Sequence, residues 1–240
     1  MCLIRYIILE LCAGTLDQIC GKGKVYSGPV LPSDQTVLYQ IADGLHYIHS
    51  HKLVHRDVKP ENVLISLTGQ IKLSEFGLCK SQITSPATMD TFSAGGFKAP
   101  VMWMAPELLQ QLDIKPDSPV KSTPQSDIFS AGCVFFVFVT RGHANHPFGD
   151  DHNQVQNNIR NNQPINIDSK LFYRTICITI LVLTKRVHLF LKELDLDHFA
   201  ARVIKNMIEH DPLHRIPLTE VKEMFHQIIP RSSLGSSSNT

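Results

Sequence analysis

Hydrophobic residues recur at helical spacing in three stretches of the chain. In the first, residues 31–50, four apolar positions are separated by four, four and three residues: Val37, Ile41, Leu45 and Ile48. This spacing places them on one face of a helix, with Ser33 or Asp34 as the expected N-terminal cap. Residues 196–209 and 218–229 carry similar spacing, so two further helices packed on a core are predicted.

Three other apolar stretches have a different pattern. Residues 126–140 are apolar on every face, which predicts a helix at the centre of a helical domain. Residues 3–9 are predicted to form a buried strand. Two β-branched strips meet around Thr68 and Gly69 within residues 63–73, a pattern typical of a hairpin. Together these elements favour a mainly helical domain with a small sheet.

Polar and irregular segments separate these elements. Residues 79–100 are rich in Ser, Thr, Gly and Pro, which predicts a long mobile loop of a length that is usually functional. Residues 151–167 are polar and Asn-rich, and residues 231–240 are expected to form a frayed tail. The apolar stretch within 171–191 is too short to cross about 30 Å of hydrocarbon as a helix. We expect one domain over residues 1–230 and no membrane span.

Composition and charge narrow the class of protein. The 240 residues are 43% hydrophobic and carry a net charge of +1, so the chain can bury a core but has no uniform field for nucleic acid. No nucleic-acid partner is expected. The six cysteines lie far apart, which favours buried thiols in a reducing compartment over disulfides or a zinc site. The histidines are also scattered without metal-ligand spacing and are expected to be solvated, including two small groups: His46, His49 and His51, then His143 and His146.

The chemistry of the chain is concentrated in residues 55–62, HRDVKPEN. Asp57, Lys59 and Asn62 supply a carboxylate, an ammonium group and an amide oxygen on one short bend. Phosphoryl transfer needs these three groups, because a carboxylate accepts the acceptor hydroxyl's proton, a lysine lies against the phosphate and an amide oxygen ligates Mg²⁺. The alternative interpretation is a capped polar turn after a helix.

This stretch resembles the catalytic loop of eukaryotic protein kinases, H-R-D-x-K-x-x-N, with lysine at the Ser/Thr-kinase position. The resemblance implies an α+β, mainly helical, protein kinase-like fold, of which this chain holds the hinge and the C-terminal lobe. It implies that Asp57 is the catalytic base, that Lys59 steadies the γ-phosphate and that Asn62 holds a metal ion. The implied cofactors are ATP and Mg²⁺.

Further motifs follow in the order that the family has. EFG at 75–77 stands where the metal-binding D-F-G is expected, and APE at 105–107 closes the activation segment. The resemblance implies that Asp127 braces the backbone of the catalytic loop and that Arg215 pairs with Glu107. Arg56 would receive a phosphate placed on one of six hydroxyls: Ser81, Thr84, Ser85, Thr88, Thr91 or Ser93.

Several stretches are similar to the inositol-requiring enzymes, a family of kinase–endoribonucleases that sense unfolded protein in the endoplasmic reticulum: YIILELCAGTL, HRDVKPENVLIS, EFGLCK, DIFSAGCVFFVF and HPFG. This likeness implies a cytosolic protein that phosphorylates itself or a protein substrate, with a possible homodimer. It also implies that Leu9 is the gatekeeper, that Glu10 to Cys12 form the hinge and that Leu64 lies under the adenine.

Two departures from the family pattern bear on activity. Residue 75 is glutamate where the family has aspartate, and its extra methylene displaces the carboxylate by about 1.5 Å. The chain begins close to the hinge, so the glycine-rich loop and the strand lysine are expected to be missing from it, as is the ribonuclease module. We therefore expect weak phosphotransfer or none from this chain, with a pseudokinase scaffold as the alternative. No residues of this chain indicate the chemistry of a nuclease.

Overall fold

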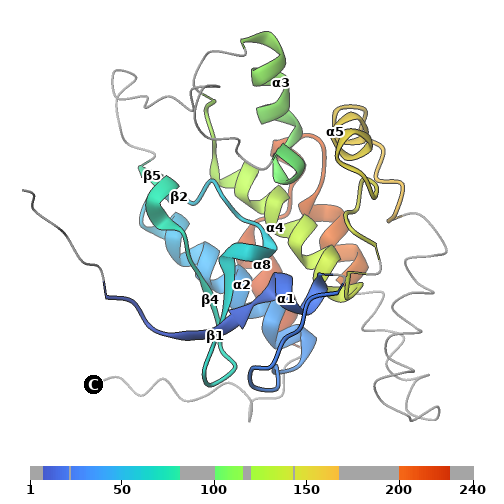
Figure 1. Cartoon of the computed structure of the whole chain (residues 1–240). Coiled ribbons are helices and arrows are strands. Elements are labelled where there is room, and N and C mark those ends of the chain that lie inside the picture. Colours follow the sequence, from blue (N-terminus) through green and yellow to red (C-terminus); the bar gives the residue numbers. More distant parts are fainter. Residues whose placement is uncertain are drawn as a thin grey trace, which may run out of the picture.

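The computed structural model describes residues 8–21, 23–81, 101–115, 120–142, 144–167 and 200–227. Most of the predicted loop at 79–100, the apolar stretch at 171–191, His143 and the tail at 231–240 lie outside these described residues. Helix α4 (Pro124–Val139) runs through the middle of the molecule, with α3 (Pro106–Ile114) and α5 (His152–Arg160) beyond one side of it (Figure 1). The small sheet lies on the opposite side.

Helix α4 confirms the prediction of a central helix. Thr123 caps it in a reciprocal pair with Ser126, and Pro124 occupies its first turn, where a missing backbone N–H costs nothing. Almost every side chain from Ser126 to Val139 is buried. The ring of Phe135 packs edge-on against Phe225 of α8 (Leu218–His226), with centroids 6.0 Å apart.

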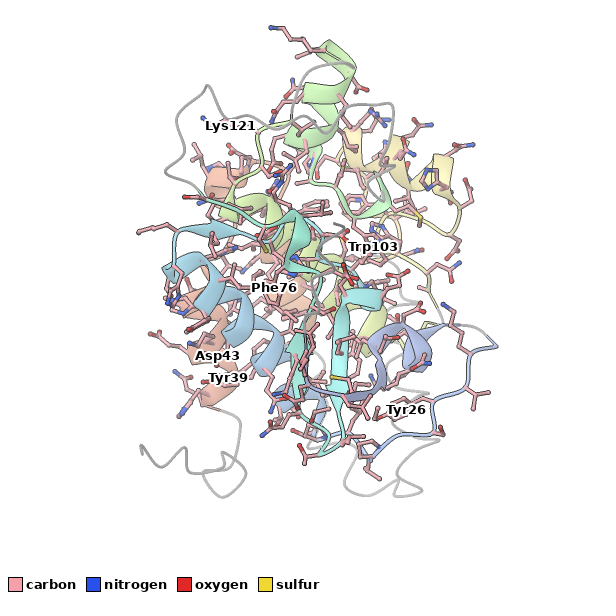
Figure 2. All side chains as sticks on the ribbon, turned by 60° about the vertical axis from the view of Figure 1, so that its left-hand side comes forward. Tyr26, Tyr39, Asp43, Phe76, Trp103 and Lys121 are labelled. Atoms are coloured by element: carbon pink, nitrogen blue, oxygen red, sulfur yellow. The ribbon has the colours of Figure 1, made fainter. Side chains whose placement is uncertain are left out.

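Helix α2 (Asp34–Ser50) also forms as the spacing predicts. Its cap is Ser33, whose Oγ accepts a hydrogen bond from the Thr36 N–H at 3.3 Å, while Asp34 is the first helical residue. The apolar stripe faces the core and its four residues are at most 5% exposed. On the face toward α8, Lys222 Nζ lies 2.6 Å from Asp43 Oδ1; Figure 2 labels Asp43 on this helix.

The predicted hairpin is confirmed within a three-stranded antiparallel sheet. Strands β3 (Val63–Ser66) and β4 (Ile71–Leu73) pair through the Thr68–Gly69 turn, where Gly69 has φ 82°. Strand β1 (Cys12–Thr15) lies on the other side of β3, giving the order β1-β3-β4. A second, two-stranded sheet joins β2 (Leu53–Val54) to β5 (Lys80–Ser81).

Short helices connect these elements. Helix α1 (Leu16–Cys20) follows β1 directly, and residues 200–207 are helical within the predicted 196–209 helix. In the described part of the chain, four 3₁₀ turns occupy loops: η1 (Pro60–Asn62), η2 (Phe76–Leu78), η4 (Val101–Trp103) and η5 (Pro212–His214). Cys20 and Cys133 are buried thiols, as expected, and burial raises the pKa of Cys20 to about 12.

Two predictions about elements are wrong or incomplete. Residues 3–7 of the predicted strand at 3–9 lie outside the described residues. Ile8 and Leu9 are 95% and 81% exposed and belong to no strand, and the first strand of the described part begins at Cys12. An apolar side chain favours burial, but it is buried only where another part of the molecule packs against it. The polar stretch at 151–167 contains α5, because two apolar residues four positions apart, Val155 and Ile159, suffice to bury one face.

Candidate active site

The bend at residues 55–62, which is the predicted catalytic bend, lies between β2 and β3 and is held by one buried carboxylate. Arg56 has φ 73°, a left-handed conformation that costs a residue with a side chain about 1 to 2 kcal/mol. Asp127, only 2% exposed at the start of α4, accepts hydrogen bonds from the N–H groups of His55 at 2.8 Å and Arg56 at 2.9 Å. This confirms that Asp127 braces the loop backbone, as the sequence predicts.

The three residues singled out in the sequence meet on this bend. Lys59 Nζ lies 2.9 Å from Asp57 Oδ2, and Asn62 Nδ2 lies 2.7 Å from the same oxygen. Asn62 Nδ2 also donates to the Asp57 carbonyl at 2.8 Å. Both partners of the Asn62 nitrogen are acceptors, so the amide is fixed with its oxygen turned away from Asp57.

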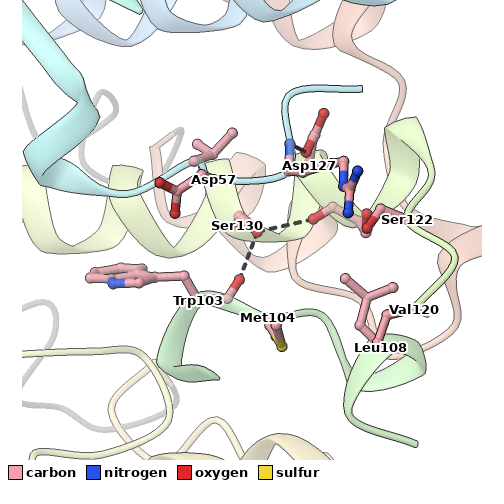
Figure 3. A pocket seen from close by; sticks show the side chains of 11 residues that line it. Asp57, Trp103, Met104, Leu108, Val120, Ser122, Asp127 and Ser130 are labelled. Carbon is pink, nitrogen blue, oxygen red and sulfur yellow. Dashed lines mark hydrogen bonds between the residues drawn. The ribbon is translucent and has the colours of Figure 1, made fainter. Parts of the chain in front are cut away.

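The second carboxylate oxygen of Asp57 has different surroundings. Asp57 is 9% exposed, and its Oδ1 is buried without a hydrogen-bond partner among the described residues. Figure 3 shows this carboxylate beside a cavity of about 30 Å³ that Trp103 and Ser130 also line. A buried carboxylate oxygen without a donor is costly, so this position favours a ligand or substrate that brings one.

His55 connects the bend to the segment that contains residue 75. Its Nδ1 accepts a hydrogen bond from the Asp57 N–H at 3.3 Å, and its Nε2 donates to the Ser74 carbonyl at 2.8 Å. Burial lowers the pKa of His55 below its ordinary value. The neutral ring with its proton on Nε2 is the form that makes both bonds.

Asn62 and Glu75 are the two residues predicted to hold Mg²⁺, and each has a side-chain oxygen of the kind that ligates this ion. The Ser74 N–H and Oγ both hydrogen-bond the Asn62 carbonyl, at 3.0 and 3.1 Å, so residue 75 follows directly after a residue fixed to Asn62. Glu75 is exposed and has φ 63°. Within the described residues no cluster of three or more His, Cys, Asp or Glu could hold a metal. Mg²⁺ binds through one or two protein oxygens plus substrate phosphates and water, so an amide and one carboxylate fit this ion.

The residues predicted to contact adenine lie on and next to the sheet. Glu10 pairs with Lys72 of β4 at 2.7 Å, and Cys12 opens β1 opposite Ser66. Leu64 pairs with Thr15 of β1, and its side chain is partly exposed while Val63 and Ile65 are buried. Leu9 precedes the sheet and is exposed.

The predicted ion pair between Glu107 and Arg215 is confirmed. Arg215 donates to both carboxylate oxygens of Glu107, at 2.8 and 2.7 Å, and its side chain is completely buried. It also donates to the Gln125 carbonyl at 2.9 Å. This arginine therefore ties α3 to the start of α4 and to the segment before α8.

The expectation that the histidines are solvated is wrong at three of the described positions: His49, His146 and His55, the last of which is completely buried in the bend. His49 Nε2 lies 2.9 Å from Asp127 Oδ2, and His146 is completely buried beside Trp103. Burial lowers the pKa of His146 to about 3. His49 follows Leu45 by four residues, so the helical stripe that predicts the core also places this histidine on the inner face.

Comparisons with known proteins agree with this geometry. The model of the protein kinase domain family matches residues 4–226. The human serine/threonine-protein kinase/endoribonuclease IRE2 is 43% identical over 152 residues, which cover 61% of this chain. The Caenorhabditis elegans serine/threonine-protein kinase/endoribonuclease ire-1 is 30% identical over 219 residues, 88% of this chain.

A third relative, from Schizosaccharomyces pombe, is a sensor for unfolded proteins in the ER, with 31% identity over 179 residues and 65% of this chain. The chain spans 15 to 19% of the length of these three relatives. Among the described residues no helix is long and apolar enough to cross a membrane. The family match over most of the sequence shows that the chain belongs to the protein kinase family, with serine/threonine-protein kinase/endoribonucleases among its relatives.

Proposed function

We propose that this chain carries the catalytic lobe of a serine/threonine protein kinase, which transfers the γ-phosphoryl group of ATP to a hydroxyl of a protein. Asp57 accepts the proton of that hydroxyl, Lys59 lies against the transferred phosphate, and Asn62 with Glu75 holds Mg²⁺. Residues 1–230 form the hinge and large lobe of the kinase domain. Leu9, Glu10, Cys12 and Leu64 line the adenine side of the nucleotide site.

The different surroundings of the two Asp57 oxygens carry this proposal. Oδ2 is held by Lys59 and Asn62, which orients the carboxylate, while Oδ1 is buried and without a partner in the described chain. A general base needs an oxygen within hydrogen-bond reach of the proton that it accepts. Oδ1 satisfies this requirement once a substrate hydroxyl reaches it.

The other two residues support charge neutralisation. Lys59 is partly buried, so its ammonium group acts on a phosphate in a medium less polar than water. Mg²⁺, when bound, neutralises charge on the phosphate oxygens. Asn62 is 5% exposed and cannot turn without breaking two hydrogen bonds to Asp57, so its oxygen is positioned in advance.

Phosphate transfer to a basic protein tests the proposal. The chain is incubated with γ-labelled ATP and Mg²⁺, and labelled phosphoserine and phosphothreonine are then separated from phosphotyrosine. We expect label on serine and threonine, none after chelation of Mg²⁺, and at least about a 100-fold loss in Asp57→Asn, because general acid–base catalysis contributes about 10² to 10⁴. Equal labelling by the wild type and by correctly folded Asp57→Asn would contradict it.

Glu75 favours a second candidate, a pseudokinase that binds a partner without catalysis. Its carboxylate is exposed on a left-handed residue and is one methylene longer than the aspartate of the family motif. The partner would be an intact kinase of the same kind. A second copy of this chain, in a homodimer, is the other partner that the resemblance implies. Association that does not depend on nucleotide, in a chain without phosphotransfer, would support this candidate over the first.

By resemblance to its relatives, we propose that the kinase domain acts on the cytosolic side of the endoplasmic reticulum membrane. Its substrate there is another protein or a second copy of itself. Fractionation of cells that express the full-length protein, followed by protease treatment of intact membranes, tests this placement. Digestion of the kinase domain in unbroken vesicles is the expected result, and protection would contradict it.

A further inference from the structure

His49 is the third donor to the carboxylate that holds the catalytic bend. It lies in the last turn of α2, and its Nε2 is 2.9 Å from Asp127 Oδ2. The same oxygen accepts the His55 N–H at 2.8 Å, while Oδ1 accepts the Arg56 N–H at 2.9 Å. Because a carboxylate only accepts, the proton of this contact resides on Nε2 of His49.

Bulk water has little access to this contact. The side chain of Asp127 is 2% exposed and that of His49 is 12% exposed. A charged carboxylate in such a place depends on its hydrogen bonds, and the loss of one leaves part of its desolvation cost uncompensated. The carboxylate can then recover solvation only by moving or by taking up a proton, and either change weakens its hold on residues 55 and 56.

That hold determines where the catalytic base lies. Arg56 has φ 73°, so the backbone immediately before Asp57 stays in this conformation only while the surrounding contacts stabilise it. Asp57 Oδ1 must lie within about 3 Å of the acceptor hydroxyl, and an error near 1 Å can cost about 100-fold in rate. A small relaxation at residue 56 therefore acts directly on the transfer step.

We infer that His49 is a positioning residue for phosphoryl transfer, acting through Asp127 and the backbone of residues 55 and 56 on the Asp57 carboxylate. This inference rests on the proposed function. His49 touches neither nucleotide nor acceptor in this arrangement, so its loss lowers kcat and leaves the KM for ATP unchanged. Loss of a purely structural residue would instead lower the fraction of folded protein, without a specific fall in kcat at constant KM.

The test compares three variants in α2 that all suit a helix. His49→Leu removes the donor, His49→Gln keeps an N–H near the position of Nε2, and His46→Leu is the matched control one turn earlier, at a partly buried histidine that donates to no carboxylate among the described residues. We expect kcat to fall about 10- to 100-fold in His49→Leu with the KM for ATP within about twofold of wild type. His49→Gln should recover most of the rate, and His46→Leu should match wild type.

Backbone amide NMR shifts separate this inference from the proposed function. In His49→Leu the amides of residues 55 to 57 should shift, and in His49→Gln and His46→Leu they should stay near their wild-type positions. Unshifted amides at these residues in His49→Leu, or a normal kcat, would overturn the inference. Wild-type labelling no higher than that of Asp57→Asn would instead overturn the proposed function, and the amide shifts would still decide whether His49 positions the bend.

Discussion

The neighbours of Asp57 fix the orientation of its carboxylate, as the proposed role in proton transfer requires. Lys59 and Asn62 both hold Oδ2, at 2.9 and 2.7 Å, and this fixes the direction of Oδ1. His55 forms one hydrogen bond with the Asp57 backbone and another with Ser74, so it connects Asp57 to the residue before Glu75. Local sequence spacing brings these residues together because all lie within one loop and the following hairpin.

Glu75 is the residue whose change should increase activity. In Glu75→Asp the carboxylate withdraws by one methylene toward the backbone, to the length that the family motif has. We expect kcat to rise about 10-fold or more, because a misplacement near 1 Å can cost about 100-fold. Titration of activity with Mg²⁺ should also show a lower half-saturating concentration. Glu75→Gln, which keeps the length but removes the charge, serves as the control and should lower activity.

His146 should make stability depend on pH. Its pKa is lowered by burial to about 3 from an ordinary value of 6.5, so between these values the unfolded chain binds a proton that the folded chain does not. The free energy of unfolding should therefore fall as pH falls below 6.5, by about 1.4 kcal/mol per pH unit from this residue. Urea denaturation of the wild type and of His146→Asn at pH 7, 6 and 5 measures the difference. Equal slopes in the two proteins would contradict the prediction.

Contacts between residues distant in the sequence could not be predicted from it. The motif identifies Asp57, Lys59 and Asn62, and their meeting within one loop follows from short spacing. The contact between His49 and Asp127 joins residues 78 positions apart, and the burial of His146 depends on Trp103 from another segment. Contacts of this range are set by tertiary packing, which composition and periodicity do not specify.

At the scale of elements, helix ends and apolar stripes were predictable where local signals agree. Ser33 caps α2, the Thr68–Gly69 turn forms the hairpin, and α4 is buried at almost every position from Ser126 to Val139, as its apolar character predicts. Helix α5 was not predicted because its sequence is mostly polar and only two of its residues are buried. The prediction of a buried strand at 3–9 is wrong at its two described residues, Ile8 and Leu9, which are exposed.

The ion pair between Glu107 and Arg215 should dominate the docking of α3. Each single change, Glu107→Leu or Arg215→Leu, leaves one partner without its opposite charge and should cost about 3 to 5 kcal/mol of unfolding free energy. The double variant should cost less than the sum of the two, because no unpaired charge remains. Chemical denaturation of all four proteins gives the coupling energy, and simple additivity would show that the pair does not act as a unit.

At the scale of the whole molecule, α4 links the site to the core. Asp127 at its start holds the catalytic bend, Ser130 donates to the Trp103 carbonyl at 2.6 Å, and Phe135 packs on α8. The family motifs predict this architecture as a whole. Periodicity alone predicts separate helices and a hairpin, because it carries no information on which elements pack against α4.

Phe135→Ala should show how much this central helix contributes. The side chain is completely buried against Phe225, so truncation creates a cavity and should lower the free energy of unfolding by about 3 to 5 kcal/mol. Tyr47→Ala, in an exposed position of α2, provides the contrast and should change stability by less than about 1 kcal/mol. A small effect at Phe135 would mean that α4 is not the centre of the core.

The most direct test of the account is a crystal structure of the chain with Mg²⁺, a non-hydrolysable ATP analogue and a serine peptide. We predict that the serine hydroxyl lies about 2.6 to 3.2 Å from Asp57 Oδ1, and that Asn62 Oδ1 lies about 2.0 to 2.1 Å from Mg²⁺. Lys59 should contact the terminal phosphate. A terminal phosphate bound elsewhere, with Asp57 Oδ1 still buried and without a partner, would contradict the assignment of these residues to phosphoryl transfer.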